Sequence, residues 1–107
     1  MNNKKQTFGI EDDMFIRGKV PMTKSEIRVI TLSKLQLYED SIVLDVGAGT
    51  GSISIECALM VPNGKVYAVE ANSEGIDLIY KNMEKFQVNN LLPIHGMAPD
   101  AMRCYQR

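Results

Sequence analysis

The residues with the clearest chemical meaning form the run VLDVGAGTG at positions 43–51. Gly47, Gly49 and Gly51 follow an apolar stretch directly, and a missing Cβ there permits unusual backbone dihedrals and lets a ligand lie against main-chain amides. A sharp turn from a strand into a helix at such glycines is a typical cradle for a nucleotide. A tight turn without a ligand is the alternative, but three alternating glycines after a buried strand favour a ligand site.

The spacing of these glycines and two nearby acids indicate which ligand to expect. A dinucleotide motif reads G-x-G-x-x-G/A, whereas the third glycine here arrives one position early and Ser52 occupies the last place. Asp45 stands where a pyrophosphate would lie, and like charges repel, so a cationic sulfonium with an ammonium group suits the site better. Glu70 closes the next apolar run, spaced as an acid that binds ribose hydroxyls, although it could be only a solvated strand end. The pattern predicts S-adenosylmethionine.

These residues require a parallel sheet that brings the ends of its strands together. Short β-branched and apolar runs predict strands over 41–46, 65–69 and 91–95, the first buried on both faces and the last at an edge because Pro93 cannot donate to a ladder. Helices are predicted over 24–37, over 52–60 and behind Asn72, an N-cap. The alternation predicts an α/β, Rossmann-like fold with right-handed crossovers and helices on both faces.

The helix patterns also predict which side chains face the core. Thr23 and Glu26 have the spacing of a capping box, with the apolar residues Ile27, Ile30 and Leu35 following on one stripe. In the last helix Ile76, Ile79, Met83 and Phe86 recur on one face, which leaves Lys81, Asn82, Glu84 and Lys85 facing water.

Composition limits the possible function classes. The chain has 107 residues with 45% hydrophobic and 23% charged side chains and a net charge of -1, which gives no support for nucleic-acid binding. No stretch approaches the roughly 18 apolar residues of a membrane span. Cys57 and Cys104 fit neither a metal-ligand spacing nor a disulfide framework, so we expect no metal and a cytoplasmic location, with Cys57 a small buried apolar side chain.

Four segments together resemble one enzyme family. They are GIEDDMFIRGKVPMTKSEIR at 9–28, VLDVGAGTGSISIE at 43–56, VYAVEAN at 66–72 and HGMAP at 95–99. The glycine run alone is typical of all class I methyltransferases, whereas the lead-in FIRGKVPMTKSEIR narrows the choice. The chain resembles the CbiT family, the decarboxylating cobalt-precorrin-6B (carbon-15) methyltransferases of cobalamin biosynthesis.

The resemblance implies a reaction and a set of cofactor contacts. The family methylates carbon 15 of a precorrin-6 type tetrapyrrole with S-adenosylmethionine and removes carbon dioxide from the acetate on carbon 12. The cofactor-binding residues it implies are Thr23 from the lead-in, Gly47, Ala48, Gly49, Thr50 and Gly51 around the methionine part, Glu70 on the ribose, and backbone near Ala98 at the adenine. Met97 departs from the family pattern, which has an acid before Ala-Pro, so the adenine contact must come from backbone or be lost.

The tetrapyrrole substrate is rich in carboxylates and calls for nearby positive charge. Arg17, Lys19, Lys24 and Arg28 supply it, and we expect Arg17 and Arg28 to bind substrate because arginine grips a carboxylate with two donors. A solvated charged face is the alternative. His95 is interpreted as a hydrogen-bonded strand-end residue, and no residue is assigned to the decarboxylation.

The resemblance also sets the expected domain organisation. Residues 1–22 are an irregular lead-in, and 23–107 are the N-terminal part of the S-adenosylmethionine-binding domain. Since the family's sheet continues past a third strand, the chain is expected to be a truncated half. Its first strand would then have an unpaired, apolar edge, so either another chain covers it, as in the homo-oligomer we expect, or the isolated piece is poorly behaved. The alternatives are a methyltransferase for another small molecule, a non-catalytic cofactor-binding fragment, and a nicotinamide-dependent oxidoreductase half-domain, which Asp45 and Ser52 disfavour.

Overall fold

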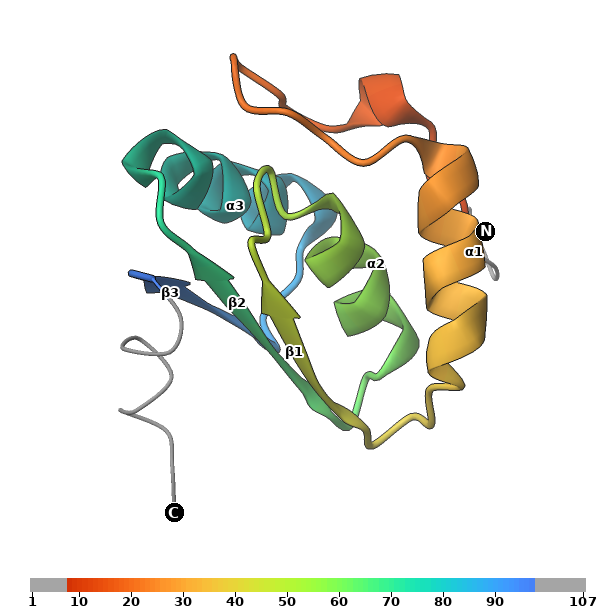
Figure 1. Cartoon of the computed structure of the whole chain (residues 1–107). Helices are drawn as coiled ribbons and strands as arrows, with labels where there is room; N and C mark the ends of the chain where they lie inside the picture. The colour runs from red at the N-terminus through yellow and green to blue at the C-terminus, as the bar shows by residue number, and fades with distance from the viewer. Residues whose placement is uncertain (1–7, 98–107) are drawn as a thin grey trace.

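Three parallel strands and three α-helices alternate along the chain in the computed structural model, which describes residues 8–97 (Figure 1). The order is a 3-10 turn η1 (Asp12–Met14), α1 (Ser25–Leu35), β1 (Ile42–Val46), α2 (Ser52–Met60), β2 (Lys65–Glu70), α3 (Ser73–Phe86) and β3 (Leu91–His95). The predicted strands and the helix over 52–60 are therefore confirmed to within a residue. Residues 8–22 of the lead-in are irregular apart from η1.

The sheet has the order β1-β2-β3, so both crossovers advance in the same direction. Right-handed crossovers then place their helices on one face, and α2 and α3 do lie together on one side of the sheet, with α1 packed outside α2 (Figure 1). The prediction of helices on both faces is wrong for the part of the chain that the structure describes. β3 pairs with β2 alone among these strands, which agrees with the edge position predicted from Pro93.

β1 shows the consequence of the one-sided arrangement. Val43 is buried and pairs in register with Val66, which in turn pairs with Leu91, and this row faces the helices. Ile42 and Leu44 point the other way and are 76% and 48% exposed. The strand is therefore not buried on both faces as predicted, because no described element covers its outer face.

α1 starts within one residue of the predicted Lys24 and ends two residues before the predicted Leu37, but its predicted capping box and inner face are both wrong. Lys24 is the N-cap and no side chain caps the helix; Ser25 donates to Glu26 instead, so the capping box does not form. Arg28 and Leu32 are the buried residues of α1, whereas Ile27 and Ile30 are more than half exposed. A buried arginine replaces the expected apolar stripe because its charge is neutralised inside the protein.

The start of α3 is as predicted, but one of its polar residues is not. Asn72 caps the helix by accepting a hydrogen bond from the Glu74 amide at 2.8 Å. Ile79 packs in the core as expected. Asn82, predicted to face water, has no exposed surface, and its amide binds two distant stretches of backbone.

The core lies between the helices and the inner face of the sheet. It gathers side chains from all three strands, from α1, α2 and α3, and from Ile10 and Phe15 of the lead-in. Cys57 lies within it, and burial raises the pKa of its thiol to about 12, which fits the predicted small apolar role. None of the helices described in residues 8–97 has the length and apolar character needed to cross a membrane.

Candidate functional site

The glycine turn, residues 47–51, joins the end of β1 to the start of α2. Gly47, Gly49 and Gly51 have φ angles of +75°, +60° and +86°, in the left-handed region that side chains rarely adopt. The amides of Gly47 and Ala48 both donate to the Val69 carbonyl, at 2.8 and 3.1 Å. These bonds fasten the turn to the end of β2, so the predicted conformational need for glycine is confirmed.

Glu70 lies directly against this turn. Its Oε1 accepts a hydrogen bond from the Gly49 amide at 2.7 Å, and its Oε2 accepts from the Asn72 amide at 2.9 Å. Gly75 makes the approach possible, since a Cβ there would lie 2.9 Å from both the Glu70 Cγ and the Gly49 carbonyl oxygen. The structure thus brings together the two parts of the site predicted from sequence. Each carboxylate oxygen keeps a further lone pair for a hydroxyl donor.

The two sides of the glycine turn differ in what they face. A Cβ built on Gly47 would meet nothing within 4 Å, so the backbone there borders open space. A Cβ on Gly49 would instead lie 3.1 Å from the carbonyl oxygen of Pro21, because the lead-in passes over that residue. A ligand on this turn therefore has room beside Gly47, under a lead-in that lies over Gly49.

Asp45 supplies a second carboxylate beneath the turn. Its Oδ2 accepts a hydrogen bond of 2.6 Å from the Ser54 hydroxyl on α2. Burial raises the pKa of Asp45, the Ser54 hydrogen bond opposes that shift, and the nearby charge of Glu70 adds to it. A cationic ligand group at this end of the sheet would relieve the repulsion between Asp45 and Glu70.

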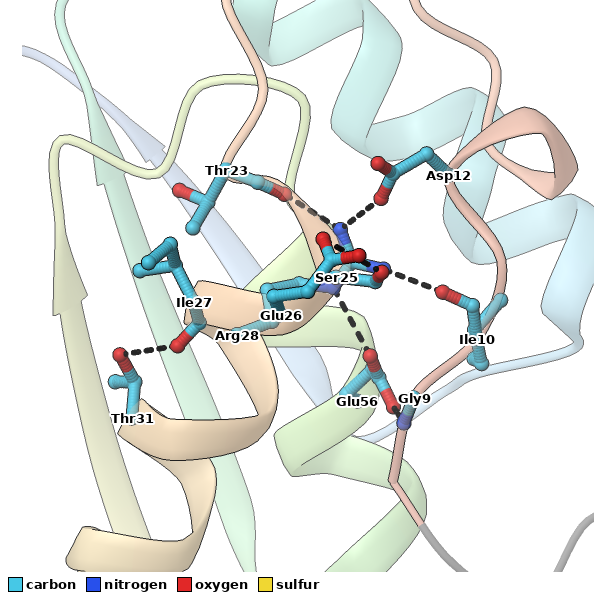
Figure 2. A network of polar contacts seen from close by, with 10 residues as sticks. All are labelled: Gly9, Ile10, Asp12, Thr23, Ser25, Glu26, Ile27, Arg28, Thr31 and Glu56. Atoms are coloured by element: carbon cyan, nitrogen blue, oxygen red, sulfur yellow. Dashed lines mark hydrogen bonds and ion pairs between the residues drawn. The ribbon is translucent and has the colours of Figure 1, made fainter.

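Arg28 lies inside the protein, closed off from solvent. Its Nε donates to Glu56 at 3.0 Å and its Nη1 to Asp12 at 2.9 Å, and its other bonds go to the carbonyls of Thr23 and Ile10 (Figure 2). Its side chain has no exposed surface. This position does not agree with the predicted contact to substrate carboxylates; the guanidinium holds the lead-in against α1 and α2.

The other residues predicted for the site make fewer contacts in the structure. Thr23 binds Arg28 through its carbonyl, while its side chain points away from the guanidinium (Figure 2). Arg17 is exposed on the lead-in, and Met97 is 70% exposed. His95 shares a hydrogen bond of 3.1 Å with the Ala71 carbonyl, consistent with its predicted strand-end role. Ala98 lies outside the described residues.

Two residues of the site were missed by sequence reasoning. Asn82 binds the Thr50 carbonyl in the glycine turn, and Glu74 accepts from the Lys19 amide in the lead-in. Asn82 was predicted to face water and no role was predicted for Glu74, and only their hydrogen bonds to distant backbone reveal them. Within residues 8–97 no three His, Cys, Asp or Glu side chains gather in a way that could hold a metal ion.

Known proteins match this chain over most of its length. A family model described as the precorrin methyltransferase domain covers residues 13–107. The chain belongs to this family. A relative from Sulfurisphaera tokodaii is 48% identical over 88% of the chain, and the cobalt-precorrin-6B C(15)-methyltransferase (decarboxylating) of Salmonella typhimurium is 45% identical over 84%.

A solved structure supports the same relationship. The precorrin-6y C5,15-methyltransferase of Geobacter metallireducens superimposes with a TM-score of 0.84 at 40% identity, covering 90% of the chain and 51% of that protein. The chain likewise covers 50% and 47% of the Sulfurisphaera and Salmonella relatives. It therefore spans about half the length of the curated relatives it matches. The predicted family and Rossmann-like fold are confirmed.

Proposed function

We propose that this chain forms the cofactor-binding half of a decarboxylating cobalt-precorrin-6B C(15)-methyltransferase. The proposal rests on family membership and on one observation, the 2.7 Å hydrogen bond that joins Glu70 to the glycine turn at Gly49. That contact holds the Glu70 carboxylate, which we propose binds ribose, beside a turn whose backbone at Gly47 borders open space. In folds whose parallel strands alternate with helices, a nucleoside binds at the carboxyl ends of the strands, which is where both of these features lie.

S-adenosylmethionine is the cofactor that fits these residues. Gly47, Ala48, Gly49, Thr50 and Gly51 would border its methionine part, and Glu70 its ribose hydroxyls. Asp45, half-buried below the turn, suits a ligand that carries positive charge and disfavours a pyrophosphate. When bound, the sulfonium supplies a methyl group already activated for in-line displacement. The task of the chain is then to hold and orient it and to exclude water.

The substrate assignment extends the family relationship to this chain. We propose a precorrin-6B type tetrapyrrole that is methylated at carbon 15 and decarboxylated, as the name of the Salmonella relative gives for that protein. The acetate on carbon 12 as the group that loses carbon dioxide follows from the family resemblance. Arg17 is exposed on the lead-in and is free of the buried network that occupies Arg28, so it is the better candidate for a substrate carboxylate. Thr23 and backbone near Ala98 complete the proposed cofactor contacts.

We also propose a cytoplasmic homo-oligomer. The support is the outer side of β1, which has no strand partner among residues 8–97 and adjoins an apolar, exposed sheet face. A second copy of the chain could pair with this edge.

Calorimetry with S-adenosylmethionine tests the cofactor assignment. Glu70→Ala should weaken binding by about 1.5 to 3 kcal/mol, since it removes charge-assisted bonds to ribose. The affinity of Glu70→Gln should lie between those of wild type and Glu70→Ala, because its one side-chain oxygen can still accept from the Gly49 amide. Glu84→Ala, an exposed change on α3, is the matched control. Unchanged affinity in Glu70→Ala would remove Glu70 from the site, and tighter binding of NAD than of S-adenosylmethionine would favour the oxidoreductase alternative.

A further inference from the structure

Asn82 lies within α3 and has no exposed surface. Both the oxygen and the nitrogen of its side-chain amide make hydrogen bonds. Its Oδ1 accepts from the Ile16 amide at 2.8 Å, and its Nδ2 donates to the Ile16 carbonyl at 3.0 Å. These two bonds satisfy both main-chain groups of Ile16, as a neighbouring strand would. The same Nδ2 donates to the Thr50 carbonyl in the glycine turn at 3.0 Å. One side chain therefore joins α3, the lead-in and the turn.

Glu74 makes a second attachment near the start of α3. Its Oε2 accepts from the Lys19 amide at 3.1 Å. The lead-in is thus fixed to α3 at residues 16 and 19, immediately before it passes over the glycine turn. The Pro21 carbonyl oxygen then comes within 3.1 Å of the position that a Cβ on Gly49 would take. The hydrogen bonds from α3 therefore help to fix the distance between the lead-in and the glycine turn.

We propose that Asn82 is a positioning residue of the cofactor site, which it shapes without touching the ligand. It holds the lead-in and the Thr50 carbonyl at a fixed separation, and so sets how closely the Pro21 carbonyl lies over Gly49. The inference rests on the proposed binding of S-adenosylmethionine at the turn. Only an amide meets the requirement, because the site needs an acceptor for one N–H and donors for two carbonyls.

Asn82→Asp is the sharpest variant, since it keeps the shape and removes the donors. Asn90→Asp is its matched control: Asn90 Nδ2 donates to the carbonyls of Ala58 and Val61 at 3.0 and 2.8 Å, just before β3 and at the opposite end of the sheet from the turn. Both variants lose two amide-to-carbonyl bonds, so both are expected to lower the unfolding midpoint. Only Asn82→Asp should change the site.

The experiment measures S-adenosylhomocysteine affinity by calorimetry and the rate of trypsin cleavage after Arg17 and Lys19, both exposed in the lead-in. Asn82→Asp should weaken affinity about tenfold or more and speed cleavage severalfold, because buried bonds to the lead-in are lost. Ligand should slow cleavage of wild type and protect the variant less. Asn90→Asp should leave affinity and cleavage rate within about twofold of wild type, since its bonds lie far from the turn.

The outcomes separate this inference from the proposed function. Absence of binding by wild type would overturn the proposed cofactor and this role with it. Binding by wild type with equal losses in Asn82→Asp and Asn90→Asp would overturn the positioning role alone. If Asn82→Asp does not fold, Glu74→Ala on the surface of α3 replaces it, with Asp77→Ala of the same helix as control. Faster cleavage without weaker affinity in Glu74→Ala would also overturn the role.

Discussion

Arg28 stabilises the fold through buried charged contacts, so its replacement should lower the free energy of unfolding. Arg28→Met leaves the buried carboxylate of Glu56 without its partner, and breaking a buried pair in this way costs about 3 to 5 kcal/mol. We expect a loss of that size in the free energy of unfolding measured by urea titration. Arg17→Met, on the exposed lead-in, should change it by less than about 0.5 kcal/mol.

A double variant checks the cause of that loss. Arg28→Met combined with Glu56→Gln should recover part of the stability, because the unpaired charge disappears while a carbonyl can still accept from the Gly9 amide. A double variant no more stable than Arg28→Met would show that the loss comes from packing around the guanidinium, including its contact with the Phe15 ring, and not from the unpaired charge.

Asp45 should make stability depend on pH. Burial raises its pKa above the ordinary 3.8, so the folded protein holds this proton more tightly than the unfolded chain does. The corresponding stability is fully present below the unfolded pKa and is lost as pH rises through the folded value. Asp45→Asn removes that dependence, while its amide oxygen can still accept from Ser54.

The measurement is a set of thermal unfolding midpoints across this pH range. The midpoint of Asp45→Asn relative to wild type should rise as pH increases from below about 4 to neutral. Asp77→Asn on the surface of α3 should show no such trend. A constant difference across the range would mean that Asp45 titrates normally. The same Asp45→Asn change should weaken S-adenosylmethionine binding, since it removes a charge that favours a cation.

Among individual residues, the sequence predicted those whose role depends on their own backbone conformation or charge. The glycine turn and Glu70 were recognised because spacing after a buried run fixes where they must lie. Asn82 and Arg28 were misassigned because each serves backbone far away in sequence. Helical periodicity predicts that a polar residue faces solvent. That prediction fails when the side chain binds distant backbone in place of water.

Among the elements, α3 offers a test at its C-terminus. Gln87 has φ 55° and ψ 45°, a left-handed conformation that costs a side chain about 1 to 2 kcal/mol and costs glycine almost nothing. Gln87→Gly should raise the free energy of unfolding by up to about 1 kcal/mol, since greater freedom of the unfolded chain offsets part of the gain. Urea titration measures the change.

Gln36, the C-cap of α1, provides the comparison. It has a similar φ of 53°, but its Nε2 donates to the Ser33 carbonyl at 2.7 Å, a bond that glycine would lose. Gln36→Gly should therefore stabilise less than Gln87→Gly. A larger gain at Gln36 would show that the side-chain bond contributes little and that backbone strain differs between the two caps.

The elements themselves were predicted more reliably than their burial. Strand and helix bounds follow from local runs and breakers, so β3 and α2 agree to the residue with their predicted ranges. The burial of β1 and α1 depends on which elements cover them. The pattern of β1 suits a strand covered on both faces, whereas the described chain covers one. Its outer side chains are apolar, yet no element within residues 8–97 covers them.

On the scale of the whole molecule, two apolar surfaces stand out within residues 8–97 as uncovered by any described element. One is the outer face and free edge of β1, where Ile42, Leu44 and Val46 are 76%, 48% and 53% exposed. The other is the outer side of α1, where Ile27 and Ile30 are 55% and 57% exposed. A helix satisfies its own backbone, but an edge strand also presents unpaired N–H and C=O groups, so the β1 surface is the stronger site for association.

We therefore expect this chain to associate through β1. Two copies related by a twofold axis can pair their β1 edges antiparallel and cover each other's apolar side chains. The weight-average mass in sedimentation equilibrium should rise with concentration, and Leu44→Lys should return it to the monomer value because a charge at the edge opposes pairing. Ile27→Lys places the same charge on an equally exposed side chain of α1 and should leave association unchanged. A wild-type mass that stays monomeric at all concentrations, or an equal effect of both lysines, would contradict pairing through β1.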